Sequence, residues 1–134
     1  MGSEKLLLEI TREQARVISE ACECLARLHM GQLEEIVWLF GPKYWMVKSE
    51  ADGIILKLKQ VLFRELFPHG YHSIASPFLP DKARIAFDLH QVIRHHLAGP
   101  KPEGWFPLIY HDKPRQTSRE QPLAVIKEIS GKGD

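Results

Sequence analysis

The stretch TREQARVISEACECLARL, residues 11–28, has the clearest helical pattern in the chain. Thr11 is a good N-cap residue, and Gln14 stands at the position that completes a capping box. Apolar side chains recur at spacings of three and four on one side of the predicted helix: Val17, Ile18, Ala21, Cys24, Leu25 and Leu28. We therefore expect an amphipathic helix that packs this side against the core and ends near Gly31.

Three further segments have helical spacing: residues 33–40, 49–66 and 80–97. Each is followed by a proline or a glycine-proline pair, which cannot continue a helix. The segment 49–66 has a broad apolar face made of Ile54, Ile55, Leu58, Val61, Leu62 and Leu66. We expect these helices to bury their apolar sides in one shared core.

The two ends of the chain have the alternation of β-strands. Leu6, Leu8 and Ile10 fall on one side of residues 5–10, and residues 105–110 and 123–129 are rich in β-favouring types. A lone N-terminal strand needs a partner, which only the C-terminal region offers. The sequence therefore predicts an α+β fold in which three or four helices pack on a small sheet formed by the N-terminal and C-terminal strands.

Length and charge limit the class of protein. A chain of 134 residues is expected to form one domain over residues 1–134, with residues 1–4 and 130–134 disordered. The formal net charge of +1 gives no general attraction to bulk nucleic acid or anionic lipid. No apolar run approaches the length that spans a bilayer, and none follows a basic N-terminus, so we expect a cytoplasmic protein without a membrane partner.

No motif for catalysis is present in the sequence. It contains no G-x-S-x-G elbow, no glycine-rich phosphate loop and no zinc-protease element. Seven histidines raise the possibility of a metal site, yet His90 and His95 are five residues apart on a predicted helix, and the adjacent His95 and His96 diverge. We expect no metal, no cofactor and no enzymatic activity.

The predicted helix 80–97 has an unusual polar side. Arg84, Asp88, Gln91 and His95 form one strip of it, and Phe87 lies with Gln91 and Arg94 along its edge. An aromatic plane, an amide and a guanidinium can together hold a base and a phosphate. The alternative is a partly exposed helix face with local ion pairs. The loop 69–73 is joined to this helix by fewer than ten residues and can fold along the same side. The sequence thus predicts a ligand pocket lined by His72, Ser73, Gln91, Arg94, His95, Gln32 and Phe87.

Several short pieces of the chain resemble a family of small uncharacterised proteins encoded by tailed bacteriophages and prophages. The pieces are LEITREQA at residues 8–15, LHMGQLEE at 28–35, GYHSI at 70–74, DLHQVIRHHLA at 88–98 and EQPL at 120–123. The chain departs from that pattern at Ala75, where a glycine is expected. The resemblance implies expression inside an infected bacterial host and a small accessory role there.

The resemblance, together with analogy to phage proteins of this size, favours a binding function. We expect a non-enzymatic protein that antagonises bacterial defence by sequestering a small nucleotide-derived immune signal. The first alternative is a protein-binding inhibitor of a host enzyme or complex, and a metal-dependent nucleotide hydrolase is a further one. The three Trp and several loop aromatics also favour a homodimer or higher oligomer.

Overall fold

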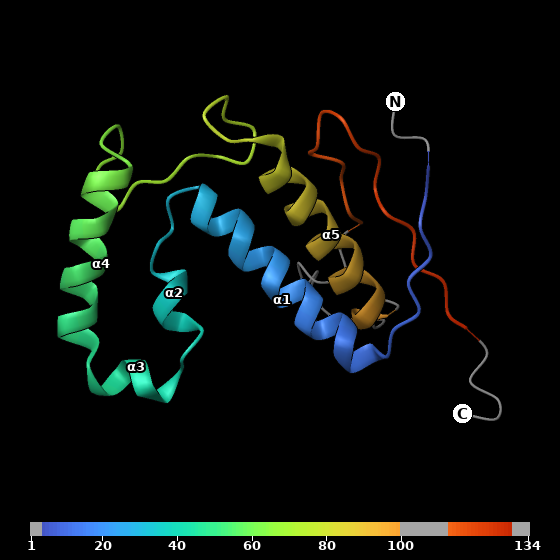
Figure 1. Cartoon of the computed structure of the whole chain (residues 1–134), viewed down its shortest axis with the longest axis horizontal. Coiled ribbons are helices and arrows are strands. Elements are labelled where there is room, and N and C mark those ends of the chain that lie inside the picture. The colour runs from blue at the N-terminus through green and yellow to red at the C-terminus, as the bar shows by residue number, and fades with distance from the viewer. Residues whose placement is uncertain (1–3, 100–112, 130–134) are drawn as a thin grey trace, which may run out of the picture.

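In the computed structural model, residues 4–99 and 113–129 are described, and within these ranges the secondary structure is helical, without a strand. The helices are α1 (Arg12–His29), α2 (Glu35–Trp38), α3 (Pro42–Met46), α4 (Lys48–Leu62) and α5 (Asp81–Ala98). Helices α1 and α5 lie side by side, whereas α2, α3 and α4 form a curved arm that leads away from them (Figure 1). Among the described residues, no helix combines the length and the apolar character needed to cross a membrane.

Helix α1 begins as the sequence predicts. The backbone N–H of Gln14 donates to the Thr11 hydroxyl at 3.1 Å, and the backbone N–H of Thr11 donates to the Gln14 side chain at 2.9 Å. This reciprocal capping box satisfies two backbone donors that a helix start leaves without intrahelical partners. The prediction of the helix start at residues 11–14 is confirmed.

The side of α1 that packs on α5 is made of small residues. Ala15, Ser19 and Ala26 are buried at spacings of four and seven, and Ala83 and Ala86 are buried on α5. Small side chains let the two antiparallel helices approach closely along their length. Val17 and Leu25, in contrast, are exposed, whereas Ile18, Cys24 and Leu28 of the predicted apolar side are half-buried, so the structure buries that side only in part.

The α+β prediction is wrong for the described part of the chain. Leu6 and Leu8, on the expected inner side of the strand at residues 5–10, are exposed, and residues 123–129 are extended without a ladder. Further up the C-terminal segment, the backbone N–H groups of residues 117–119 donate to carboxylates of α5 instead of a neighbouring strand. The predicted strand at residues 105–110 and almost all of the predicted terminal disorder lie outside the described residues.

The arm begins at Gly31, whose φ of 93° lies in the left-handed region. A Cβ atom there would stand 2.6 Å from a methyl carbon of Leu66, so glycine also allows the chain after α4 to lie close to this turn. Helix α4 is fastened by the Lys59 ammonium, which donates to the Gly70 carbonyl at 2.5 Å. The apolar face predicted for 49–66 is only partly buried: Ile54, Val61 and Leu62 are more than half exposed, whereas Ile55 and Leu66 are half-buried.

Candidate functional site: a cleft between α1 and α5

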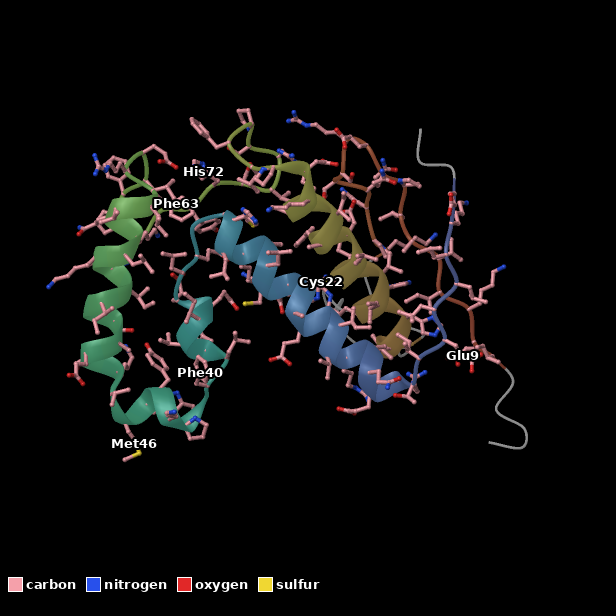
Figure 2. The ribbon with its side chains drawn as sticks, viewed as in Figure 1. Glu9, Cys22, Phe40, Met46, Phe63 and His72 are labelled. Carbon is pink, nitrogen blue, oxygen red and sulfur yellow. The ribbon has the colours of Figure 1, made fainter. Side chains whose placement is uncertain are left out.

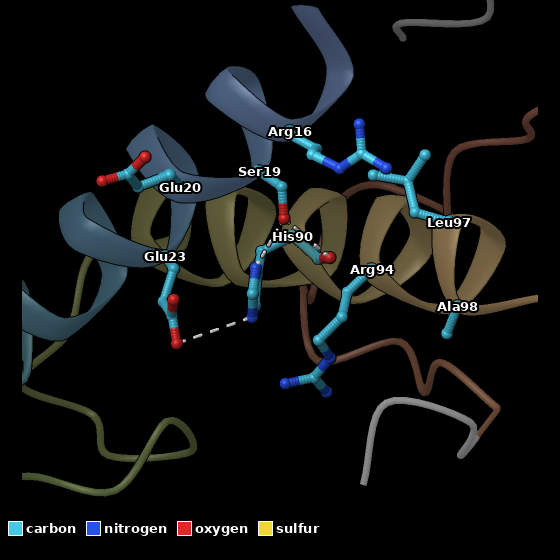
Figure 3. A pocket seen from close by; sticks show the side chains of 8 residues that line it. All are labelled: Arg16, Ser19, Glu20, Glu23, His90, Arg94, Leu97 and Ala98. Atoms are coloured by element: carbon cyan, nitrogen blue, oxygen red, sulfur yellow. Dashed lines mark hydrogen bonds and ion pairs between the residues drawn. The ribbon is translucent and has the colours of Figure 1, made fainter. Parts of the chain in front are cut away.

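A shallow cleft of about 460 Å³, widely open to solvent, lies between α1 and α5 (Figure 3). Its lining comes from both helices: Arg16, Ser19, Glu20 and Glu23 of α1, and His90, Arg94, Leu97 and Ala98 of α5. Two guanidinium groups and two carboxylates therefore edge one hollow, with a short apolar stretch at the C-terminal end of α5.

A buried polar pair lies at the base of the cleft. The Ser19 hydroxyl is 2.8 Å from His90 Nδ1, and His90 Nε2 lies 3.7 Å from a carboxylate oxygen of Glu23. The same carboxylate accepts a hydrogen bond from Arg27 Nε at 3.1 Å. Burial lowers the pKa of His90, the Glu23 carboxylate opposes this shift, and the charge of Arg94 adds to it. A neutral imidazole with its proton on Nε2 fits this arrangement, because Nδ1 can then accept from Ser19.

Ser19, His90 and Glu23 have the residue types of a hydrolase triad, yet the setting does not suit nucleophilic attack. Ser19 is buried in the middle of α1, where the backbone N–H groups are used by the helix and cannot form an oxyanion hole. Burial also raises the pKa of the Cys22 and Cys24 thiols, which lowers their reactivity. Among the described residues, no group of three or more His, Cys, Asp or Glu side chains could hold a metal ion.

The Ser19–His90 pair instead joins α1 to α5 and should make stability depend on pH. The unfolded chain takes up a proton on His90 near pH 6.5, whereas the folded chain takes it up only at lower pH. The stabilising contribution is therefore fully present above pH 6.5 and is lost as the pH falls toward the lower pKa of the folded state. His90→Gln should flatten the pH dependence of the free energy of unfolding, measured in urea between about pH 7.5 and 5.

The matched control is His69→Gln, because His69 is exposed. Some slope should persist in His90→Gln, since burial also lowers the pKa of His29. An unchanged slope in His90→Gln would contradict the role given to this buried pair.

The seven predicted pocket residues do not form one pocket. Gln32 lies in the turn after α1, His72 and Ser73 lie in the loop before α5, and the other four lie on α5. His72 and Gln32 lie at the end of α1: the His72 backbone N–H donates to the Met30 carbonyl, and the Gln32 side chain accepts from Arg27. The His72 ring also stacks on Phe78 and lies 2.6 Å from a carboxylate oxygen of Glu65. Ser73 is in the same loop, where its carbonyl accepts from the Ser76 backbone.

The other four predicted residues are on α5. Arg94 lines the cleft, and the Phe87 ring is tilted against that of His90. Gln91 exchanges hydrogen bonds with the backbone of Arg115, and His95 has a buried Nδ1 without a partner in the described structure. Of the seven predicted residues, the cleft thus contains Arg94.

Two members of the polar strip predicted on α5 are not exposed. Arg84 is 2% exposed, and its guanidinium donates to the carbonyls of Ile74, Ser76 and Leu79. Asp88 is 4% exposed and accepts from the backbone N–H groups of two residues in the C-terminal segment. The strip was expected to face solvent. Instead, the loop before α5 covers Arg84, and residues 117–118 of the C-terminal segment cover Asp88.

Sequence reasoning missed four of the cleft residues on α1 and the role of His90. The signal that could have located them is the recurrence of small residues at Ala15, Ser19, Cys22 and Ala26, which marks the side of α1 that meets another helix. A serine on that side requires a polar partner across the contact, and His90 supplies it.

Comparison of the chain with protein-family models, with curated proteins and with solved structures finds no match. The resemblance to phage and prophage proteins therefore stays a prediction from the sequence pieces.

Proposed function

We propose that the protein is a non-enzymatic phage accessory protein that counters bacterial defence by binding a small nucleotide-derived signal in the cleft between α1 and α5. The observation that carries the proposal is the placement of Arg16 and Arg94, from two different helices, on one cleft that also has Glu20 and Glu23 on its edge. The phage and defence setting comes from the sequence resemblance.

The mixed charge of the cleft suits a nucleotide better than a simple anion. Guanidinium groups bind phosphate through several N–H donors, whereas carboxylates repel it. A nucleotide also has ribose hydroxyls or base amino groups, and the carboxylates of Glu20 and Glu23 can accept hydrogen bonds from these. Leu97 and Ala98 offer an apolar surface for a base at one end of the cleft.

A second candidate is the inhibition of a host protein by direct contact. It is favoured by the exposed aromatic and apolar side chains around α2 and α3: Trp38, Phe40, Trp45 and Met46. Aromatic residues are enriched in protein interfaces, and isolated monomers seldom expose so many together.

Calorimetric titration with a panel of cyclic dinucleotides and ADP-ribose derivatives tests the first proposal. We expect one class to bind and to be recovered intact after the protein is denatured. Arg94→Ala should weaken that binding by roughly ten- to a hundredfold, because a charge-assisted contact to phosphate is lost. Arg16→Ala should weaken it in the same direction, since its guanidinium edges the same cleft.

Arg64→Ala is the matched control, because Arg64 is an exposed arginine beyond the end of α4 and is not among the residues that line the cleft. Affinity is compared per folded molecule, with the folded fraction taken from circular dichroism. An absence of nucleotide binding, a cleaved nucleotide, or full affinity in both Arg94→Ala and Arg16→Ala would each refute the proposal.

A further inference from the structure

The cleft between α1 and α5 contains a buried imidazole with one hydrogen-bond donor that the described protein does not use. His90 is 5% exposed, and its Nδ1 lies 2.8 Å from the Ser19 hydroxyl. Its Nε2 has no hydrogen-bond partner among the described residues, since a carboxylate oxygen of Glu23 at 3.7 Å is too distant to accept from it. With Nδ1 accepting from Ser19, Nε2 holds the proton. This N–H is therefore available to a ligand in the cleft.

A carboxylate with one unused oxygen lies beside this donor. Oε2 of Glu23 accepts from Arg27 Nε at 3.1 Å, whereas Oε1 has no partner in the part of the chain that the structure describes. Figure 3 shows the Glu23 carboxylate turned toward the His90 ring. An ionised carboxylate only accepts hydrogen bonds. The two side chains thus present one donor followed by acceptors.

This order of donor and acceptors distinguishes the nucleobases. The Watson–Crick edge of guanine has an acceptor, O6, followed by two donors, N1–H and N2–H, which is the complementary order. Adenine and cytosine have a single donor group on this edge, and uracil places its donor between two acceptors, one of which would face the carboxylate. Hypoxanthine is guanine without the N2 amino group. Guanine therefore forms one more hydrogen bond with this pair of side chains than the other bases do.

We propose that His90 and Glu23 recognise the Watson–Crick edge of a guanine base, with His90 Nε2–H donating to O6 and the Glu23 carboxylate accepting from N1–H and N2–H. This inference rests on the proposed binding of a nucleotide in the cleft, and it specifies the base. The guanidinium groups of Arg16 and Arg94 then bind the phosphates. Among the ligand classes named above, cyclic dinucleotides can contain guanine, whereas ADP-ribose derivatives contain adenine.

Calorimetric titration of the full chain with three matched cyclic dinucleotides tests the choice of base. The ligands are cyclic di-GMP, its inosine analogue and cyclic di-AMP, which share their ribose and phosphate groups. Cyclic di-GMP should bind about tenfold more tightly than either of the others, because each of these lacks one hydrogen bond to the carboxylate. Equal affinities, or tighter binding of an adenine ligand, would overturn the guanine assignment and leave the proposed function standing. Binding of no nucleotide at all would refute both.

A pair of variants tests the residue that distinguishes the bases. Glu23→Ala should bring the ratio of the affinities for cyclic di-GMP and its inosine analogue to about one, since the acceptor for N2–H is lost. Glu20→Ala is the matched control: Glu20 also lines the cleft, but Figure 3 shows its carboxylate turned away from His90, so the ratio should persist. Arg94→Ala should weaken both ligands by the same factor. A ratio that Glu23→Ala leaves unchanged, per folded molecule, would overturn the proposal.

A third variant tests whether the base binds elsewhere on the protein. Bases also stack on exposed aromatic side chains, and such side chains lie at the corner of the arm, where Figure 2 labels Phe40 and Met46. Trp45 of α3 is 66% exposed, and Trp45→Ala should leave both affinities unchanged. Loss of the guanine preference in Trp45→Ala, with the preference retained in Glu23→Ala, would place the base on the arm and overturn the assignment.

Discussion

Replacing Arg84 with alanine should lower the free energy of unfolding by about 3–5 kcal/mol. The guanidinium is buried, lies 3.6 Å from an Asp81 carboxylate oxygen, and donates to three carbonyls of the loop before α5. Alanine would remove the donors of the Ile74 and Leu79 carbonyls, leave the Ser76 carbonyl with the Leu79 backbone N–H alone, and open a cavity at the start of α5. Urea unfolding monitored by circular dichroism measures the loss.

Lys82→Ala is the matched control, because it removes a cation from the neighbouring, exposed position of the same helix. Its effect should stay within about 0.5 kcal/mol. Equal effects of the two substitutions would mean that charge on α5, and not the hydrogen bonds of Arg84, stabilises this region.

The burial of Arg84 could not be predicted from the sequence, although the helix that carries it could. Periodicity and capping signals located α1 and α5 to within a few residues, because these signals are local. Whether a polar side of a helix meets solvent or a returning segment depends on contacts between residues far apart in the chain. Arg84 and Asp88 therefore look like a solvent-exposed strip in the sequence and are anchoring points in the structure.

The candidate site was predictable only in part, because its residues come from two helices that are far apart in the sequence. Arg94 was identified from its place on the helix wheel, but its neighbours in the cleft come from α1, and the small residues of α1 carry a weaker signal than its large apolar ones. Val17 and Leu25 fit the conventional amphipathic pattern and are nevertheless exposed. The close approach of α1 and α5 selects the small-residue side instead.

The amphipathic pattern of α4 is present in the structure, but the described part of the chain leaves its apolar stripe largely exposed. A stripe of four apolar residues at helical spacing indicates burial, and the sequence cannot say whether the cover comes from the same chain. The expectation of a core helix was wrong for Ile54 and Val61 within one chain.

Asp88→Asn should lower the free energy of unfolding by about 2–3 kcal/mol and release the C-terminal segment from α5. The buried Asp88 carboxylate accepts from the Thr117 backbone N–H at 3.0 Å, the Ser118 backbone N–H at 2.9 Å and the Thr117 hydroxyl at 2.6 Å. These bonds hold a segment that forms no strand, so the segment depends on them for its position.

An asparagine keeps the size of Asp88 but turns one acceptor into a donor, which would face the donors of the C-terminal segment. Asp88→Asn should therefore loosen the C-terminal segment locally, in addition to lowering the free energy of unfolding of the whole chain. Hydrogen exchange of the Thr117 and Ser118 amides should accelerate more than that of amides in α1, and trypsin should cleave faster after Arg115 and Arg119. Glu120→Gln, an exposed acidic position in the same segment, serves as the control and should leave both readouts unchanged. If the two amides keep their protection in Asp88→Asn, the segment is held by other contacts, among them those of Gln91 and Asp81.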